Sequence, residues 1–251
     1  NTGFDPVPYP YTEKENPHVY FSMGTTAENV AKKFNILREE QQEFAISSHN
    51  KAHEAQKNGK LSEEIIPIGE CKEDGNIRPN STQEKLDQLK LAFDTKGTVT
   101  AATSSPLTDG AAATIICEEN YAKENNLNIL GRIVSTAVEG CDPDYMGLGP
   151  IGASKKALMR ANLSIDKIDI FELNEAFASQ SLACIKDLGI DQKKVNIDGG
   201  ALALGHPLGA TGARITGKAA DLLRRENKKY ALSTQCIGLG MGIATVIESV
   251  D

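Results

Sequence analysis

The chain has 251 residues and a net charge of −7 at pH 7, and 40% of its residues are hydrophobic. This length permits one large domain or two smaller ones with a real core, and the acidic balance argues against a nucleic acid or an anionic membrane surface as partner. No apolar run is long enough to span a bilayer, and five scattered cysteines without a C-x-x-C pair favour free thiols in a reducing compartment.

The first part of the chain contains few regular elements. The stretch Thr25-Thr26-Ala27-Glu28 resembles a capping box and predicts a short helix that runs through Phe34. A second, heavily charged helix is predicted over Arg38–Lys57, because the Asn58-Gly59 pair that follows is typical of a helix end.

Two histidines, His49 and His53, lie four residues apart on that second helix, so they could clasp a metal ion. No third ligand follows at a usable spacing and the helix looks solvated, which makes a metal site the weaker interpretation. Ile65–Ile68 is a candidate strand, and a polar stretch follows it. We therefore interpret residues 1–107 as a lid rather than as an independent core.

From Asp109 onward the pattern changes to alternating strands and helices, which is typical of a layered α/β fold. Strands are predicted at Ala111–Cys117, Gly131–Val138, Ile168–Leu173, Lys229–Gln235 and Gly242–Glu248. Helices are predicted at Glu118–Asn126, Ser154–Ala161, Glu175–Leu188 and Gly209–Glu226. The last two strands should form a hairpin-like return.

The stretch Asn196–Gly212 is the most informative part of the sequence. Its five glycines contribute no side chains to a core, so they are expected where the backbone turns sharply or is approached closely. His206 lies among them, followed by Pro207. The positive end of the next helix would disfavour imidazolium and keep a neutral ring available as a base. The alternative is a glycine-rich turn with an incidental histidine.

The helix that follows carries small residues at a spacing of three and four, which would allow another helix to approach one face closely. These residues are Gly209, Gly212, Ala213, Thr216, Gly217 and Ala220.

Three further clusters lie at strand ends, where α/β folds place their chemistry. Asn174-Glu175-Ala176-Phe177 closes one strand, and Asn174 could instead be a helix N-cap. Cys236 ends another strand, and a buried cysteine is often inert packing. Thr103–Pro106, with Asp109-Gly110, could be only a turn. Gly147–Gly152 matches G-x-G-x-x-G, but no predicted strand precedes it and Pro150 interrupts it, which argues against a dinucleotide site.

Together these clusters resemble the thiolase family. The match runs through Met23–Asn29, Gly97–Thr100, Ser105, Asp109–Ala112, Asn174–Phe177, Gly199–Gly212 and Cys236–Gly238, and so covers nearly the whole chain. Ketosynthases share the superfamily fold but lack the Asn-Glu-Ala-Phe and Cys-x-Gly pairing. The local sequences around Thr103, Cys141 and Cys184 resemble those of degradative 3-ketoacyl-CoA thiolases more than those of biosynthetic acetoacetyl-CoA thiolases. Ala102 is a departure, because relatives usually carry glycine before the serine-bearing loop.

The resemblance implies a five-layer αβαβα fold of two similar halves, with a loop domain inserted in the first. Residues 1–107 would form most of the loop (lid) domain, and residues 108–251 the C-terminal thiolase domain with a βαβαβαββ order. The first half, which carries the family's nucleophilic cysteine, is missing. None of Cys71, Cys117, Cys141 and Cys184 stands in that cysteine's sequence context. We therefore expect half an active site, and a chain that is inactive by itself.

The resemblance also implies roles for individual residues. His206 would deprotonate the nucleophile, and Cys236 would be the second acid/base, which requires an accessible thiol with a tuned pKa. Asn174 would hold a water that, with His206, hydrogen-bonds the enolate oxygen, and the Gly238 N–H would serve a second oxyanion site.

Substrate contacts are implied in the same way. Ser105 would hydrogen-bond the pantetheine arm, and Arg78 is a candidate for the adenine end of CoA. Met146 and Phe177 would line the acyl pocket. No metal or redox cofactor is required, because coenzyme A is a substrate.

The implied reaction is the CoA-dependent cleavage of a 3-ketoacyl-CoA to acetyl-CoA and a shortened acyl-CoA, as in fatty acid β-oxidation. Acyl-CoA and CoA would be the small-molecule partners of a homodimer or tetramer, with the missing N-terminal half as a further partner. The expected location is cytoplasmic, or mitochondrial or peroxisomal, because a targeting segment would not be visible.

Three alternatives stay open. A biosynthetic acetoacetyl-CoA thiolase is one, and a non-catalytic assembly subunit is the second. A ketosynthase-like enzyme would need two catalytic histidines, and those besides His206 are His18, His49 and His53, all in the lid region.

Overall fold

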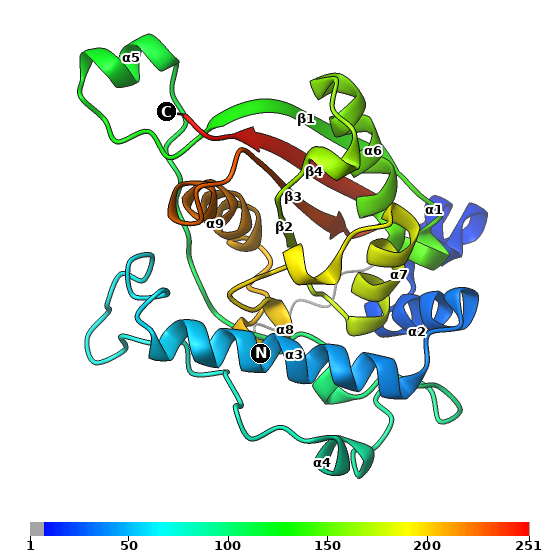
Figure 1. Cartoon of the computed structure of the whole chain (residues 1–251). Coiled ribbons are helices and arrows are strands. Elements are labelled where there is room, and N and C mark those ends of the chain that lie inside the picture. Colours follow the sequence, from blue (N-terminus) through cyan, green and yellow to red (C-terminus); the bar gives the residue numbers. More distant parts are fainter. Residues whose placement is uncertain (1–7, 251) are drawn as a thin grey trace.

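The computed structural model, shown in Figure 1, describes residues 8–250. The α-helices are α1 (Pro10–Glu15), α2 (Met23–Phe34), α3 (Arg38–Lys57), α4 (Gln83–Asp87), α5 (Glu119–Glu124), α6 (Gly149–Ala161), α7 (Ala178–Leu188), α8 (Ala201–Leu204) and α9 (Thr211–Arg225). The strands are β1 (Arg132–Gly140), β2 (Ile170–Leu173), β3 (Tyr230–Ile237) and β4 (Met241–Glu248). Short 3-10 helices are η1 (Pro17–Tyr20), η2 (Ala101–Thr103), η3 (Pro143–Leu148), η4 (Ile165–Lys167) and η5 (Gln192–Lys194).

The strands form one sheet in the order β1-β4-β3-β2. β4 pairs antiparallel with β1 and with β3, whereas β2 and β3 are parallel. The predicted hairpin-like return is therefore confirmed as the β3–β4 pair. Parallel pairing brings the carboxyl ends of β2 and β3 to the same edge, which is where Asn174 and Cys236 lie.

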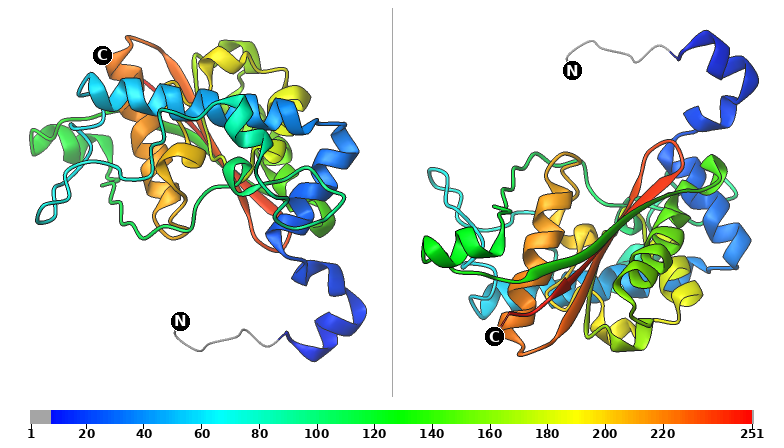
Figure 2. Two further views of the ribbon diagram at one scale, coloured as in Figure 1. Left: turned by 90° about the horizontal axis from the view of Figure 1, so that it is seen from below. Right: turned by 90° about the horizontal axis from the view of Figure 1, so that it is seen from above.

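Helices cover both faces of this sheet, because successive strand side chains point to opposite sides. Ile170 and Ala231 pack with Leu222 and other residues of α9. Phe171 and Leu232 belong to the larger core that α6 and α7 cover on the other face. Figure 2 shows the sheet lying between α9 and these two helices.

The lid region shares this core instead of standing apart from it. α3 packs against α7 and α8, and its Phe44 and Ala45 are buried in the same cluster as the sheet residues. The bounds predicted for this helix are confirmed. The division of the chain between residues 107 and 108 stays a prediction.

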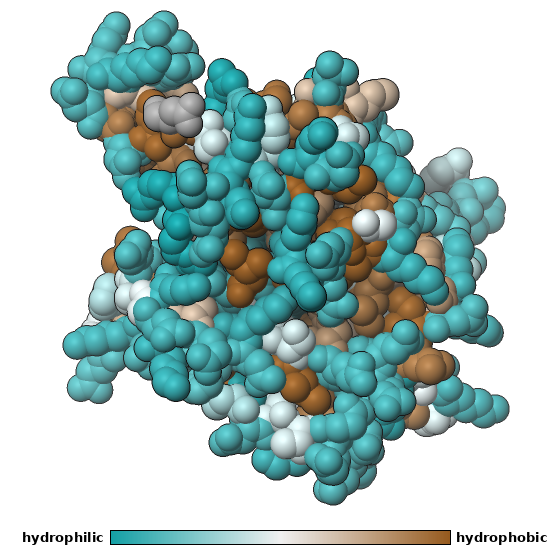
Figure 3. Space-filling view, viewed as in Figure 1, coloured by the Kyte–Doolittle hydropathy of each residue, from teal (hydrophilic) through white to brown (hydrophobic). Residues whose placement is uncertain are grey.

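Two predicted strands are absent from the described residues. Ile65–Ile68 forms only one isolated bridge, between Ile68 and Cys71. The run Ala111–Cys117 is extended but unpaired and exposed, with Ile115 at 90% exposure. Its apolar composition resembles that of a buried strand, but no described strand lies beside it to supply ladder hydrogen bonds. Figure 3 shows apolar atoms at the surface of the lobe that carries α5, next to this run.

Several helix starts differ from the predictions, among them that of α9, which begins at Thr211 instead of Gly209. α2 begins at Met23 after Ser22, whose hydroxyl accepts the Thr25 N–H, so the expected capping box lies inside the helix. α6 begins earlier, at Gly149. α7 begins only at Ala178, so the interpretation of Asn174 as its N-cap is wrong.

The predicted small-residue face of α9 is only partly covered. Its Gly217 lies against Thr114, where an added Cβ would come 2.9 Å from the threonine methyl group. The fully buried side of the helix is a different one and includes Ile215, Ala219 and Leu222. No helix among residues 8–250 is both long and apolar enough to cross a membrane.

Candidate active site

The side chains of Asn174 and His206 meet at the edge of the sheet. Asn174 follows β2 directly, and its backbone N–H donates to the Thr234 carbonyl of β3 at 2.9 Å, which extends the ladder by one residue. His206 follows Gly205, whose φ of +97° reverses the chain after α8. The amide nitrogen of Asn174 lies 3.3 Å from Nε2 of His206.

A threonine fixes the proton on the His206 ring. Nδ1 of His206 lies 2.6 Å from the Thr211 hydroxyl oxygen, and that hydroxyl donates its single hydrogen to the Pro207 carbonyl at 3.1 Å. The hydrogen-bond network thus assigns the ring hydrogen to Nδ1, with the Thr211 oxygen accepting it while the hydroxyl donates to Pro207. Nε2 is left with its lone pair, facing the Asn174 amide. Thr211 is fully buried, and the sequence analysis did not single it out.

The surroundings of His206 favour the neutral ring. Burial is the larger cause that lowers its pKa, and the positive charge of Arg214 on α9 lowers the pKa further. The direction agrees with the expectation of a neutral base. Arg214 is a contributor that the sequence analysis missed, although it follows the glycine stretch by only two residues.

His206 is accessible from one side. A hollow at the surface is lined by Leu107, Thr108, Asp109, His206 and Leu208. Thr108 packs so closely on Gly205 that a Cβ there would overlap the threonine side chain. The oxygen of the Asn174 amide is buried without a hydrogen-bond partner among the described residues.

Cys236 lies in a compact apolar cluster. Its neighbours there are Met146 and Ala176, with Met23 and Phe177 packed against them. The structure thus brings the expected acyl-pocket residues, Met146 and Phe177, together with the expected acid. The thiol is only 9% exposed, and burial raises its pKa to about 12. The expectation of an accessible thiol is therefore wrong, because the apolar cluster covers it, and Cys236 stays protonated at neutral pH.

Gly238 lies at the exposed turn between β3 and β4, two residues after Cys236. A Cβ at this position would meet no atom within 4 Å. The close backbone approach occurs instead at Gly240, which has a φ of +90° and lies against the Cys141 carbonyl.

Ser105 and Arg78 lie in different surroundings. The Ser105 N–H donates to the Ala176 carbonyl at 3.0 Å, and Ser104 forms a bridge with Phe177, so this loop runs beside the Asn174–Phe177 cluster. Arg78 is exposed, and its backbone N–H donates to Nδ1 of His49 at 3.1 Å. Among the described residues it makes no contact with the His206 hollow.

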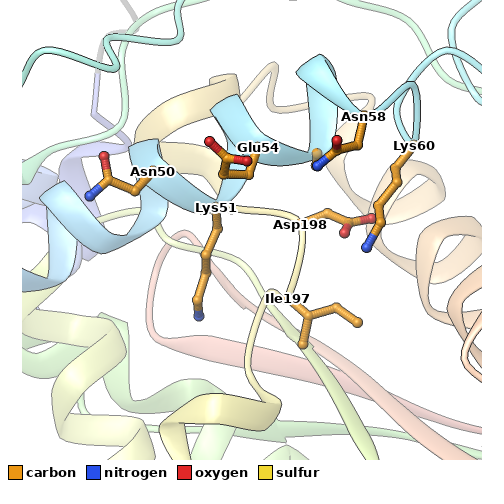
Figure 4. Close-up of a pocket in the computed structure, with 8 residues that line it drawn as sticks. Asn50, Lys51, Glu54, Asn58, Lys60, Ile197 and Asp198 are labelled. Carbon is orange, nitrogen blue, oxygen red and sulfur yellow. The ribbon is translucent and has the colours of Figure 1, made fainter.

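Metal binding finds no support in the part of the chain that the structure describes. No three histidine, cysteine, aspartate or glutamate side chains gather there as a metal site would require. His49, one half of the histidine pair on α3, already uses Nδ1 to accept the Arg78 N–H. A second hollow, between α3 and the segment at Ile197 and Asp198, is shown in Figure 4. Polar side chains line it together with Ala55 and Ile197, and no histidine or cysteine is among them.

Two family models match the chain. The model described as "Thiolase, N-terminal domain" matches residues 14–120, and "Thiolase, C-terminal domain" matches residues 127–249. A 3-ketoacyl-CoA thiolase of Vibrio vulnificus (strain CMCP6) is 51% identical, over 90% of this chain and 62% of its own length. That of Marinobacter nauticus is 49% identical, over 99% of this chain and 66% of its own.

Solved structures give the same fold. Human mitochondrial 3-ketoacyl-CoA thiolase superposes with a TM-score of 0.88 at 42% identity, covering 94% of this chain and 61% of that one. The Bacillus anthracis acetyl-CoA acetyltransferase also has a TM-score of 0.88 at 42% identity, covering 92% of this chain and 60% of its own. The chain thus spans less than two thirds of the length of these relatives. With matches that run along nearly its whole length, the chain belongs to the thiolase family.

Proposed function

We propose that this chain supplies part of the active site of a 3-ketoacyl-CoA thiolase, an acyltransferase that cleaves 3-ketoacyl-CoA with CoA. The observation that carries the proposal is the pair formed by Asn174 and His206, with Thr211 leaving the lone pair on Nε2. Curated relatives that are about half identical carry the name 3-ketoacyl-CoA thiolase. A solved human relative binds CoA and superposes over 94% of this chain.

In the proposed reaction, Nε2 of His206 takes the proton of a cysteine thiol from outside this chain. The thiolate attacks C3 of the substrate, and the C2–C3 bond breaks to leave an acyl thioester and the carbanion of acetyl-CoA. The Cys236 thiol gives its proton to that carbanion, and its high pKa keeps the proton in place until this step. The Cys236 thiolate then takes the proton of the CoA thiol, and the CoA thiolate attacks the acyl thioester to release the shortened acyl-CoA. The freed cysteine thiolate recovers its proton from His206.

The remaining residues would stabilise and hold the substrate. Asn174, through a water, and the backbone N–H of Gly238 would donate to the developing oxyanions. Ser105 would bind the pantetheine arm, beside the apolar floor of Met146 and Phe177. For Arg78 the support is its position on the lid and its exposure only.

The proposal extends to assembly and location. We propose a homodimer or homotetramer, because the α9 small-residue face is partly uncovered and Ile115 and Ile116 are largely exposed. The described cysteines are all free thiols, which supports a cytoplasmic location, with the mitochondrion and the peroxisome as alternatives. No cofactor is proposed, since CoA acts as a substrate.

A complementation assay tests the function. The chain is assayed for CoA-dependent cleavage of 3-ketoacyl-CoA alone and together with the first third of its Vibrio vulnificus relative. We expect no turnover alone, turnover in the mixture, and its loss with His206→Asn. Turnover by the chain alone would mean that one of its own cysteines is the nucleophile. A well-folded mixture that binds CoA but stays inactive would favour the assembly-subunit alternative.

A second candidate, an acetyl-CoA C-acetyltransferase, is favoured by the equally good superposition on the Bacillus anthracis enzyme. Acetoacetyl-CoA and a long-chain 3-ketoacyl-CoA distinguish the two in the same assay. Preference for the long chain supports the degradative enzyme, and acceptance of acetoacetyl-CoA alone supports the second candidate.

A further inference from the structure

Glu175 is a buried carboxylate that no step of the proposed reaction uses. It is 2% exposed and accepts hydrogen bonds from three neutral donors. The Ser48 hydroxyl donates to Oε2 at 2.7 Å, and the Leu202 N–H donates to the same oxygen at 3.1 Å. The Asn196 side-chain amide donates to Oε1 at 2.7 Å. Burial raises the pKa of Glu175, and these three hydrogen bonds together with the Lys51 charge oppose that rise.

The three donors come from segments that are far apart in the chain. Ser48 lies on α3, and its hydroxyl oxygen also accepts the Gly200 N–H at 3.0 Å. Asn196 is itself locked to the end of β2, because it accepts the Leu173 N–H and donates to the Leu173 carbonyl. Leu202 lies in α8, four residues before His206. Glu175 therefore joins the lid helix, the strand end and the turn that carries the base.

Two glycines of the informative stretch are required by this arrangement. A Cβ on Gly200 would overlap the carboxylate of Glu175. Gly199 has a φ of +86°, and its Cβ would come within 2.8 Å of the Ala52 backbone on α3. The turn can approach both the carboxylate and α3 only because neither residue has a side chain.

We propose that Glu175 is a positioning residue that sets the spacing between the Asn174 amide and the His206 ring. Glu175 is the chain neighbour of Asn174, so fixing its side chain fixes the strand end. The same carboxylate holds the Leu202 N–H, and α8 then delivers Gly205 and His206. Ser48 of α3 donates to the same carboxylate, so hydrogen bonds connect the lid helix to Asn174 and His206. The inference rests on the proposed function for the role of His206 as base.

The charged groups around Glu175 and His206 decide in which direction the His206 pKa should change when Glu175 is replaced. Lys51 of α3 and Glu172 of β2 face the same buried region, and Lys51 donates to the Val195 carbonyl at 2.8 Å. Arg214 of α9 acts on His206 from the other side. Burial and the Arg214 charge are the causes that lower the His206 pKa, and the Glu175 charge is not among them. Loosening the turn instead lets water reach the ring, which raises its pKa toward the ordinary value of about 6.5.

The test uses Glu175→Gln in the 251-residue chain, with histidine labelled for NMR. A glutamine has one acceptor oxygen and one amide donor, so it cannot accept from all three partners. We expect the His206 pKa to rise and the Leu202 amide to exchange about tenfold faster. Glu172→Gln is the matched control, since that carboxyl is equally buried and its Oε1 has no hydrogen-bond partner among residues 8–250. This change should leave Leu202 exchange unchanged.

Ser48→Ala is a milder second variant in case Glu175→Gln does not fold. It removes one donor from the carboxylate and one acceptor from Gly200, so a smaller change in the same direction is expected. An unaltered His206 pKa and unaltered Leu202 exchange in a folded variant would overturn the positioning role. If both change while the complemented enzyme keeps full turnover, Glu175 still positions the ring, and the proposed role of His206 as base fails instead.

Discussion

Nδ1 of His206 and the hydroxyl oxygen of Thr211 lie 2.6 Å apart, in a chain of hydrogen bonds that ends at the Pro207 carbonyl. This short chain decides which ring nitrogen is basic, because the threonine hydrogen is already used. The tautomer is thus selected by the first turn of α9, and the sheet contributes only the Asn174 amide on the opposite side of the ring.

Thr211→Val should keep the shape of the side chain but remove the acceptor for Nδ1–H. Without it both neutral tautomers become populated and the ring can turn, so we expect turnover of the complemented enzyme to fall by about 10–100-fold. Nitrogen chemical shifts of the His206 ring report the tautomer directly. Thr216→Val on the same helix, whose hydroxyl contacts Ser233, is the control and should leave the shifts unchanged. A single unaltered tautomer in Thr211→Val would contradict the assignment.

A buried ion cluster should contribute strongly to stability. Asp198 is 2% exposed and binds Arg225 through two hydrogen bonds and the Lys218 ammonium at 2.6 Å. Asp198→Asn takes the shared carboxylate from the buried Lys218, which keeps Glu64, and from the partly exposed Arg225, which keeps Glu226. We expect a loss of up to about 3–5 kcal/mol in the free energy of unfolding. Asp187→Asn, which breaks the more exposed pair with Lys155, should cost about 0–1 kcal/mol. Urea titrations measure both, and equal losses would show that burial does not matter here.

The same cluster predicts that the free energy of unfolding falls at acidic pH, which we call the acid limb. Burial alone would raise the pKa of Asp198, but the hydrogen bonds and charges of Arg225 and Lys218 outweigh it and hold the pKa below its usual range. The unfolded chain therefore binds the proton more readily than the folded one as the pH falls. Stability is fully present above the unfolded pKa of about 4 and is lost as the pH falls through the folded pKa. In Asp198→Asn this limb should flatten, and an unchanged acid limb would assign it to other carboxylates.

His49 should add a second pH dependence at milder acidity. Its burial, and then the Arg78 charge, lower its pKa, and its Nδ1 accepts the Arg78 N–H only while that nitrogen is unprotonated. A lowered folded pKa means that stability is kept above the unfolded value of about 6.5 and declines as the pH falls below it. His49→Gln should remove part of this decline in urea titrations between about pH 7 and pH 5. His53→Gln, one turn further along α3, serves as the control that should keep it.

Cys236 should resist alkylation although it lies at the proposed site. Its raised pKa and its burial under Met146 and Phe177 leave little thiolate at pH 8, whereas Cys71 and Cys117 are exposed. Timed treatment with iodoacetamide followed by peptide mass spectrometry should modify the two exposed cysteines first. Fast labelling of Cys236 would show that the cluster opens readily.

The sequence predicted elements well where local signals decide them. α3 has its charged surface and its Asn58-Gly59 end, and the β3–β4 pair has two short, largely apolar segments around a glycine-rich turn. The prediction from the sequence failed at Ala111–Cys117, because an apolar run becomes a strand only when a neighbouring strand is present to pair with it. The start of α7 could not be predicted either, because Asn174 is a preferred N-cap residue, whereas the helix starts after Phe177, which has no capping side chain.

Among the site residues, those in recognisable motifs could be predicted from the sequence, whereas their contacts could not. His206, Asn174 and Cys236 stood out through their motifs, but their contacts depend on tertiary structure. Ser48 and Glu175 are 127 positions apart, and neither has a periodicity or a motif that points to the other. Thr211 could have been found, because a hydroxyl five residues after a histidine at a helix start is a recognisable spacing. The burial of Cys236 could not, since it results from Met146 of η3 closing over a strand end.

The unpaired run Ala111–Cys117 has a consequence for how the chain behaves toward proteases. An extended, exposed backbone without ladder hydrogen bonds is what a protease cleft accepts, so elastase should cut first within this run. The two resulting pieces should nevertheless elute together, because Phe44 and Ala45 of α3 lie inside the core formed by the second piece. A nicked but undivided protein would thus carry its lid as a separate polypeptide, held by packing alone.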